Sequence, residues 1–324
     1  MSRYLVTGAA GFIASRVTEM LLQAGHTVVG VDNMNDAYDV RMKEYRLKRL
    51  QQFPQFIFQK ADVAIRETIP ILAGSGPFAA VINLAARAGV RQAVENPWVY
   101  VETNMTGTLN LLELCRQTHI PKFVLASTSS IYGANAPLPT PETADSDHPL
   151  QPYAASKKGA EAMCYAYHYL HDLDVTIFRY FTVYGPAGRP DMVMFRFTKW
   201  ITEGLTVELN GDGEQTRGFT YVDDIARGTI LGLKPLGYEI INLGGHETIS
   251  INALIRMLEG MIGQKAQIEH LPFNPADMLA NQADVRKAGE LLAWESHFSL
   301  QTGVQRLVDW YLAERSWAQH IETQ

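Results

Sequence analysis

The sequence predicts an α/β protein that contains a doubly wound parallel sheet and a smaller α+β domain. Helix-like segments separate short apolar runs, which lie at residues 3–7, 27–31, 56–60, 80–84 and 122–126. Strands that alternate with helices at this spacing form a parallel sheet with right-handed crossovers. After Tyr180 the pattern changes, because Gly and Pro become frequent and the apolar runs shorten.

A glycine turn joins the first strand to the first helix, which is expected over residues 15–24. Gly8 and Gly11 stand in the run GAAGFIA, and Asp32 follows the second strand. The glycines permit a tight turn in which a dinucleotide pyrophosphate approaches the helix N-terminus, and the carboxylate accepts hydrogen bonds from ribose hydroxyls. Because a carboxylate repels a 2′-phosphate, this unit predicts a Rossmann domain that binds NAD rather than NADP.

Later strands also end in residues that suit a cofactor, since ligands of doubly wound sheets bind at the carboxyl ends of strands. Asp62 and Val63 follow the third strand and are expected beside an adenine. Ser127 and Thr128 end the strand that should face the nicotinamide. The fourth strand ends in small residues that let a cofactor pass, namely Leu84, Ala85 and Ala86.

A tyrosine and a lysine stand four residues apart in YAASK, at the start of a long predicted helix. Tyr153 and Lys157 therefore share one face of that helix. A phenol ionises near pH ~10, so a base at neutral pH needs its pKa lowered by about 3, or about 4 kcal/mol. A nearby ammonium and the positive ring of an oxidised nicotinamide supply that change. A Tyr and a Lys at this spacing also occur as an ordinary surface pair, so the surrounding motifs must decide.

The net charge, the cysteine count and the lengths of the apolar runs exclude several classes of protein. The 28 basic and 34 acidic residues give a net charge of −6 without a basic block, so nucleic acid is not an expected partner. Cys115 and Cys164 lie in apolar helical patterns, which argues against a disulfide framework or a metal site. The N-terminus begins with a strand pattern, and the chain lacks an apolar run of the roughly 18 residues that a membrane span needs. A cytoplasmic protein is therefore expected.

At 324 residues the chain suits a large domain that carries a smaller one. A strand over residues 174–180 closes the first half. The NAD-binding domain is expected over residues 1–181, with a return segment near 218–247, and the substrate domain over 182–217 and 248–324. Other expected elements are a loop at 137–152, a helix start within 220–225, a strand at 239–243, and helices at 39–53, 97–117, 192–203, 250–261 and 300–313.

Nearly the whole chain resembles the extended short-chain dehydrogenase/reductases, and within them the nucleotide-sugar 4-epimerases. The motifs that carry the resemblance are TGAAGFIA, KADV, NLAA, ASTSSIYG, YAASK, RYFTVYGP, RGFTYVDDIA and INLGG. Three stretches are most similar to UDP-glucuronate 4-epimerases, namely DNMNDAYDVRMKEYRL, NLAARAGVRQAVENP and FTVYGPAGRPDM. The resemblance implies an enzyme with tightly bound NAD, a UDP-sugar substrate and a homodimer, whose helices near residues 96–116 and 156–171 supply the interface.

The resemblance also implies site residues. Thr128, Tyr153 and Lys157 would handle the proton of the sugar C4 hydroxyl while NAD takes and returns the C4 hydride through a 4-keto sugar. The implied cofactor contacts are Gly8, Gly11, Phe12, Ile13, Asp32, Asp62, Val63, Leu84, Ala85, Ala86, Tyr153, Lys157 and Tyr180. The implied substrate contacts are Thr128, Ser129, Thr182, Arg189, Arg217, Asp277 and Arg87.

Several of these roles have alternatives. Either Ser127 or Ser129 would assist Thr128 in the proton relay, although hydroxyls also cap strand ends. Arg87 would reach the sugar or a neighbouring subunit, or remain a solvated loop charge. Thr182, Ser129 and Arg189 are the candidate clamp for a sugar carboxylate, because an arginine forks onto a carboxylate. The alternative is that Arg189 pins a loop.

Residue types separate the related reactions. Sugar 4,6-dehydratases have Asp-Glu where this chain has Ser129 and Ser130, and UDP-glucuronate decarboxylases have Glu at the position of Ser130. Hexose 4-epimerases usually have Phe-Asn where this chain has Phe181 and Thr182. The sequence thus predicts conversion of UDP-glucuronate to UDP-galacturonate. The alternatives are a UDP-glucose/UDP-galactose 4-epimerase, a UDP-uronate decarboxylase, a net reductase and a non-catalytic NAD-binding sensor.

Overall fold

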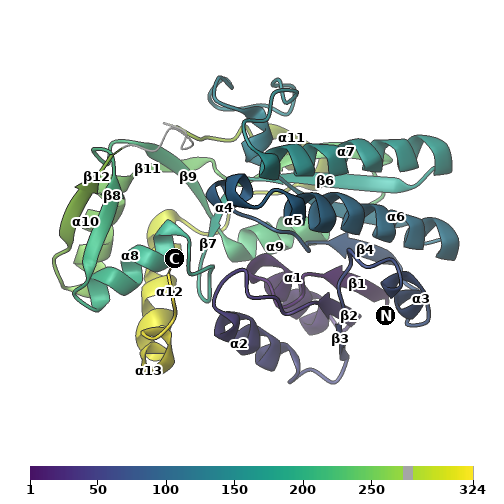
Figure 1. The fold of residues 1–324 in the computed structure, drawn as a ribbon, viewed down its shortest axis with the longest axis horizontal. Coiled ribbons are helices and arrows are strands. Elements are labelled where there is room, and N and C mark those ends of the chain that lie inside the picture. The colour runs from purple at the N-terminus through teal and green to yellow at the C-terminus, as the bar shows by residue number, and fades with distance from the viewer. Residues whose placement is uncertain (273–279, 324) are drawn as a thin grey trace.

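The computed structural model describes residues 1–272 and 280–323. Its centre is a seven-stranded sheet in the order β10-β6-β5-β4-β1-β2-β3, in which every neighbouring pair is parallel (Figure 1). The predicted doubly wound parallel sheet is confirmed. Its strands are β1 (Arg3–Thr7), β2 (Thr27–Asp32), β3 (Phe56–Lys60), β4 (Ala80–Asn83), β5 (Lys122–Thr128), β6 (Asp174–Tyr180) and β10 (Tyr238–Leu243).

Helices cover both faces of this sheet, and alternate residues of each strand pack on opposite faces. In β1, Leu5 packs in the cluster beneath one helical layer, whereas Val6 packs beneath the other. The first layer consists of α3 (Thr68–Ala73), α6 (Gly107–Thr118) and α7 (Pro152–His171). The second consists of α1 (Phe12–Gln23), α9 (Val222–Leu231) and α11 (Arg286–Leu292).

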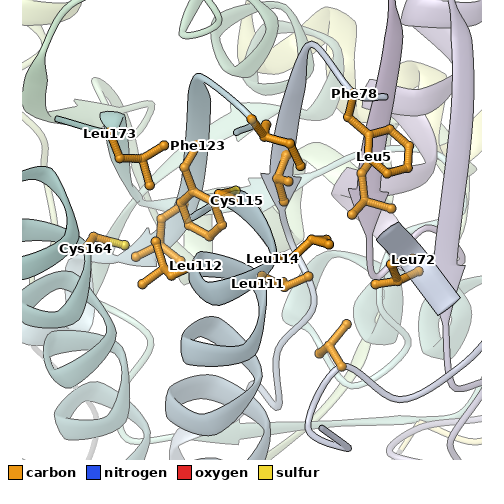
Figure 2. Packing of buried hydrophobic residues seen from close by; sticks show 14 of the residues in the cluster. Leu5, Leu72, Phe78, Leu111, Leu112, Leu114, Cys115, Phe123, Cys164 and Leu173 are labelled. Atoms are coloured by element: carbon orange, nitrogen blue, oxygen red, sulfur yellow. The ribbon is translucent and has the colours of Figure 1, made fainter. Parts of the chain in front are cut away.

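Both cysteines lie in the first of these layers. Figure 2 shows Cys115 of α6 among Leu111, Leu112 and Phe123, with Cys164 of α7 nearby. Both thiols are buried and form no disulfide. They serve as small apolar side chains between the helices and the sheet.

A second group of elements gathers on one side of the sheet (Figure 1). It holds a three-stranded sheet in the order β11-β9-β7 and a two-stranded sheet of β12 and β8. Its apolar core is separate from the two clusters of the large sheet. The strands are β7 (Thr182–Tyr184), β8 (Thr206–Asn210), β9 (Thr216–Tyr221), β11 (Glu247–Ser250) and β12 (Gln267–Leu271), and the helices are α8 (Val193–Thr202), α10 (Ile251–Ile262), α12 (Leu300–Ala313) and α13 (Arg315–Ala318).

The chain passes between the two groups more than once. Strands β9 and β11 belong to the smaller group, whereas β10 between them pairs with β6 of the large sheet. Helix α2 (Val40–Leu50) contributes Met42 to a cluster with Phe195 and Tyr311 of the smaller group. The domain limits expected at residues 181, 218–247 and 248 stay a prediction.

Several element bounds differ from the expectation. Helix α1 begins directly after Gly11, three residues earlier than expected, and β5 continues to Thr128. The helix expected over 97–117 is divided into α5 (Trp98–Tyr100), a π-helical turn (Val101–Thr106) and α6. A further short helix, α4 (Val90–Glu95), precedes it. Within the described residues, none of the helices has the length and apolarity of a membrane span.

The hydrogen bonds of one buried side chain, Asn104, account for the π-helical turn. The buried Asn104 side chain accepts a hydrogen bond from the backbone N–H of Arg87 and donates to the Arg87 carbonyl and to Ser156 of α7. These bonds hold the amide toward the β4 loop and α7, where a wider turn accommodates it. Asn104 is therefore a packing amide.

Gly30 in β2 is required by close packing under the glycine turn. A Cβ atom there would lie 2.6 Å from the Phe56 ring and 2.8 Å from the Ala9 Cβ. We expect Gly30→Ala to lower the free energy of unfolding by about 1–3 kcal/mol, because the core must shift. Urea denaturation at saturating NAD measures this change.

Gly260 provides the matched control. It lies exposed in α10, where a Cβ would meet no atom within 4 Å. Gly260→Ala should raise the free energy of unfolding by up to about 1 kcal/mol, because alanine favours the helix. A Gly30→Ala protein as stable as the parent would contradict the packing argument.

Candidate active site

A cavity of about 1080 Å³ lies between the carboxyl ends of the sheet strands and the smaller group of elements. Among the described residues, it brings together nearly all of the sequence-predicted site. The lining includes Gly8, Gly11, Phe12, Ile13, Asp32, Asp62, Val63, Leu84, Ala85, Ala86, Thr128, Ser129, Tyr153, Lys157, Tyr180, Thr182, Arg189 and Arg217. Asp277 lies outside the described residues, and Arg87 is not among the lining residues.

The glycine turn has the geometry that a pyrophosphate needs. Gly8 has a φ of +69°, and a Cβ on it would lie 2.9 Å from the backbone nitrogen of Ala85. The Gly11 N–H donates to the Gly8 carbonyl at 2.7 Å, and α1 starts at the next residue with no side-chain cap. Because Gly11, Phe12 and Ile13 line the cavity, the first turn of α1 fits an anionic group.

Asp32 is buried at the end of β2 and is held by backbone N–H groups. Its two oxygens accept from Ala10 at 3.2 Å and from Met34 at 2.8 Å. Each carboxylate oxygen accepts more than one hydrogen bond, so both retain capacity for ribose hydroxyls. The Lys43 ammonium lies 3.5 Å from Asp32 and also lines the cavity, a contact that the sequence analysis missed.

Asp62 organises the neighbouring loop. It accepts from the Asn33 amide and from the backbone N–H of Ala64, both at 2.9 Å. Val63 beside it is buried, and its carbonyl accepts from Asn110 of α6. The loop after β3 is thereby fixed against both the β2 end and α6.

Tyr153 and Lys157 lie on the face of α7 that meets the end of β5. The helix is capped by Gln151, whose side chain accepts from the Ala154 N–H, and Pro152 occupies the first position. Thr128 lies close enough to Tyr153 for its hydroxyl to lower the pKa of the phenol, and the Tyr100 ring packs edge-on against Tyr153. The three predicted catalytic residues thus meet at one wall of the cavity.

Burial acts on the two titratable groups in opposite directions. It raises the pKa of Tyr153, while the Thr128 hydrogen bond and the Arg189 charge lower that pKa. It lowers the pKa of Lys157 to about 8, against the raising effect of Glu161. Arg189 is therefore a further charge that favours the phenolate, and the same role expected of Lys157 stays a prediction.

Ser127 and Ser129, the two serines that were candidates for the proton relay, have different hydrogen-bond partners. Ser127 donates to Glu161 at 2.5 Å, and Arg179 donates to the same carboxylate at 2.8 Å. Both serines line the cavity, but the Ser129 hydroxyl is approached there by the Asn281 amide at 3.4 Å. Ser129, rather than Ser127, is thus the serine with its hydroxyl available to a ligand.

Arg189 is held by a carboxylate two residues later. Its Nε donates to Asp191 at 3.1 Å, and Nη2 donates to the second oxygen of the same carboxylate. Within the described residues, Nη1 makes no hydrogen bond, and both side chains line the cavity. The guanidinium is oriented on one edge and retains donors on the other. Thr182 of β7 lines the same cavity.

Comparison with known proteins decides the family. Residues 4–244 match the model of the NAD dependent epimerase/dehydratase family. The chain belongs to this family. It is 55% identical to a UDP-glucuronate 4-epimerase of Thermodesulfobacterium geofontis over 311 residues, which are 96% of both chains.

Solved structures of other family members have the same fold. A UDP-glucuronic acid 4-epimerase from Bacillus cereus, in complex with UDP-glucuronic acid and NAD, is 35% identical with a TM-score of 0.90, over 96% of this chain and 99% of that one. A UDP-glucose 4-epimerase from Thermotoga maritima with UDP-glucose is 31% identical with a TM-score of 0.90, over 97% and 99% of the two chains.

Among the polar residues that line the cavity of this epimerase/dehydratase family member, Asp191, Lys43 and Asn281 were not predicted from the sequence. Asn281 is buried at the cavity wall, and its side-chain oxygen has no hydrogen-bond partner within the described part of the chain. None of the three stands at a spacing that marks a motif, although Asp191 follows Arg189 in GRPDM.

Arg87 serves the loops around the cavity. Its guanidinium donates to the Asn35 side-chain oxygen at 3.2 Å, and that oxygen also accepts from Lys43 at 3.1 Å. Asn104 binds the Arg87 backbone through its N–H and its carbonyl. This geometry makes Arg87 a loop anchor, and its expected contact with the sugar or a neighbouring subunit stays a prediction.

We expect Thr128→Val to move the ascending limb of the kcat/KM pH profile to higher pH. The substitution removes a hydrogen bond that lowers the pKa of Tyr153, so the phenolate forms only at higher pH. The loss of activity should therefore be largest at low pH and shrink as the pH rises. The control is Thr118→Val on α6, whose hydroxyl donates to the Leu114 carbonyl. A parallel loss at all pH values would contradict the role of Thr128 in ionising Tyr153.

Proposed function

We propose that this protein is a UDP-glucuronate 4-epimerase, which uses bound NAD to interconvert UDP-glucuronate and UDP-galacturonate. The observation that carries the proposal is one cavity that holds the Thr128–Tyr153 pair together with Arg189. The 55% identity to the T. geofontis UDP-glucuronate 4-epimerase supports the choice of substrate.

The residues around the glycine turn would hold NAD. Gly8, Gly11 and the start of α1 accommodate the pyrophosphate, and Asp32 accepts from a ribose. Lys157, which lines the same cavity as Tyr153, would bind the nicotinamide ribose. When bound, NAD supplies a hydride acceptor and donor for the sugar C4 and a positive ring near Tyr153.

The protein residues move the proton. Tyr153 as phenolate accepts the proton of the C4 hydroxyl, and Thr128 hydrogen-bonds to the same phenol. The resulting 4-keto sugar turns within the cavity and presents its other face. Tyr153 then returns the proton to the C4 oxygen, so that C4 is inverted with no net oxidation.

The proposed contacts of Arg189, Thr182 and Ser129 with the sugar carboxylate would protect the 4-keto sugar from losing CO₂. A 4-keto uronate is a β-keto acid, which loses CO₂ when the breaking bond stands perpendicular to the carbonyl plane. The open Nη1 edge of Arg189, with Thr182 and Ser129, would hold the carboxylate nearer that plane. The same contacts favour a uronate over a neutral hexose.

The test of this function is incubation of the purified protein with UDP-glucuronate, UDP-glucose and UDP-xylose without added NAD. C4 inversion is followed by NMR, and CO₂ release is measured in parallel. We expect UDP-galacturonate as the main product with little CO₂. Inversion of UDP-glucose alone would favour the hexose epimerase, and stoichiometric CO₂ from UDP-glucuronate would favour the decarboxylase.

Two variants connect this activity to the site. Tyr153→Phe should lower kcat by about 10²–10⁴-fold while bound NAD is retained, because the base is lost. Arg189→Ala should lower kcat/KM for UDP-glucuronate at least tenfold more than kcat/KM for UDP-glucose, because loss of the charge that lowers the pKa of Tyr153 affects both sugars, whereas loss of the carboxylate contact affects only the uronate. A Tyr153→Phe protein as active as the parent would support the non-catalytic sensor instead.

We also propose that the protein is a homodimer in the cytoplasm. Helices α6 and α7 pack side by side (Figure 1), and the region around them exposes large apolar side chains. Trp98 and Tyr169 are each 75% exposed. Apolar surface of this extent is typical of an interface.

Tyr169→Glu is expected to shift the protein from dimer to monomer, because a charge would be buried in the interface. Sedimentation velocity at several concentrations measures the change. Leu205→Glu is the control, since Leu205 is 46% exposed between α8 and β8 of the smaller group. Equal sedimentation of both variants and the parent would remove this interface.

A further inference from the structure

Arg46 of α2 carries a buried charge that the mechanism does not use. Its exposed fraction is 3%, and within the described residues no carboxylate lies within ion-pair distance of its guanidinium. Its partners are oxygens of carbonyl groups and one phenol. Since a buried charge is costly unless it is well hydrogen-bonded, this arrangement indicates a specific role.

The guanidinium joins two loops that are far apart in the sequence. Nε and Nη2 donate to the Ala187 carbonyl at 2.9 and 2.7 Å, and Nη2 donates to the Gly188 carbonyl at 3.0 Å. Nη1 donates to the Ala10 carbonyl at 3.1 Å and to the Tyr38 hydroxyl at 2.7 Å. Ala10 lies in the glycine turn, and Gly188 directly precedes Arg189.

The loop before Arg189 depends on these contacts. Ala187 has a φ of +53°, which is unfavourable for a residue with a Cβ and persists where surrounding contacts hold it. The Gly188 N–H donates back to the Gly185 carbonyl at 3.1 Å, so the segment is a tight turn. Arg46 binds the Ala187 and Gly188 carbonyl groups of this turn.

Aromatic rings complete the environment of Arg46. Its guanidinium carbon lies 5.5 Å from the Tyr38 ring centre and 5.9 Å from the Phe12 ring centre. Both rings line the cavity. Arg46 thus contacts the glycine turn, the Arg189 loop and the cavity wall.

We propose that Arg46 is a positioning residue that holds Arg189 in register with the cofactor-binding turn. By binding Ala10 and the Ala187–Gly188 carbonyls together, it fixes the distance between the carboxylate-binding guanidinium and the site of the C4 chemistry. This inference rests on the proposed function. A lysine has a single point donor group and would not bridge both loops.

The test compares ligand binding in the NAD-bound enzyme. Dissociation constants of UDP-glucuronate and UDP-glucose are measured by calorimetry for the parent, Arg46→Lys, Arg189→Ala and the double variant. We expect Arg46→Lys to weaken UDP-glucuronate at least tenfold and UDP-glucose less than threefold. In the Arg189→Ala background the effect of Arg46→Lys on UDP-glucuronate should disappear, because the residue acts through Arg189.

Arg49→Lys is the matched control on the same helix. Arg49 pairs with Glu19 at 3.0 Å and its side chain is 46% exposed, so this variant should bind both ligands within twofold of the parent. Should Arg46→Lys fail to fold, Tyr38→Phe removes one Arg46 partner, and its preferential weakening of UDP-glucuronate must likewise vanish in the Arg189→Ala background.

Three outcomes would overturn the inference. They are equal weakening of both ligands, an undiminished effect in the Arg189→Ala background, and unchanged binding by Arg46→Lys. Each of these is distinct from failure of the proposed function, which the parent enzyme reveals by not inverting C4 of UDP-glucuronate.

Discussion

The acidity of the Tyr153 phenol is the constraint on which the rest of the site depends. Burial raises its pKa, yet a buried site is also what excludes water from the reacting sugar. The Thr128 hydroxyl and the Arg189 charge act in the opposite direction and lower that pKa. In the proposed function, the positive ring of bound NAD would lower it further.

Two buried polar networks keep α7 against the end of β5. On one side, Ser127 and Arg179 donate to the Glu161 carboxylate, one turn after Lys157. On the other side, Asn104 links Ser156 to the loop after β4. Because these partners come from different strands and helices, the position of the catalytic pair is set by long-range contacts, and a helix with the same local sequence would not hold it.

Helix α2 connects the wall of the cavity that holds the glycine turn to the wall that holds Arg189. Met42 packs with Phe195 and Tyr311, while Arg46 binds backbone carbonyls of both the glycine turn and the Arg189 loop. Apolar packing alone resists separation of the two walls but tolerates sliding between them. Directional hydrogen bonds from one planar guanidinium restrict that sliding, which matters for a substrate held at both its carboxylate and its C4 hydroxyl.

The sequence by itself determined the order of strands and helices, the glycine turn with Asp32, and the placement of Tyr153 and Lys157 on one helix face. These features depend on residues a few positions apart. Only the tertiary structure decided that Ser127 turns to Glu161, that Asn104 widens its helix and that Arg46 reaches the Arg189 loop. Their partners lie 34, 17 and 141 residues away, and no local spacing reveals such contacts. The effect of the Arg189 charge on the pKa of Tyr153 was missed for the same reason, because the two residues are far apart in the sequence.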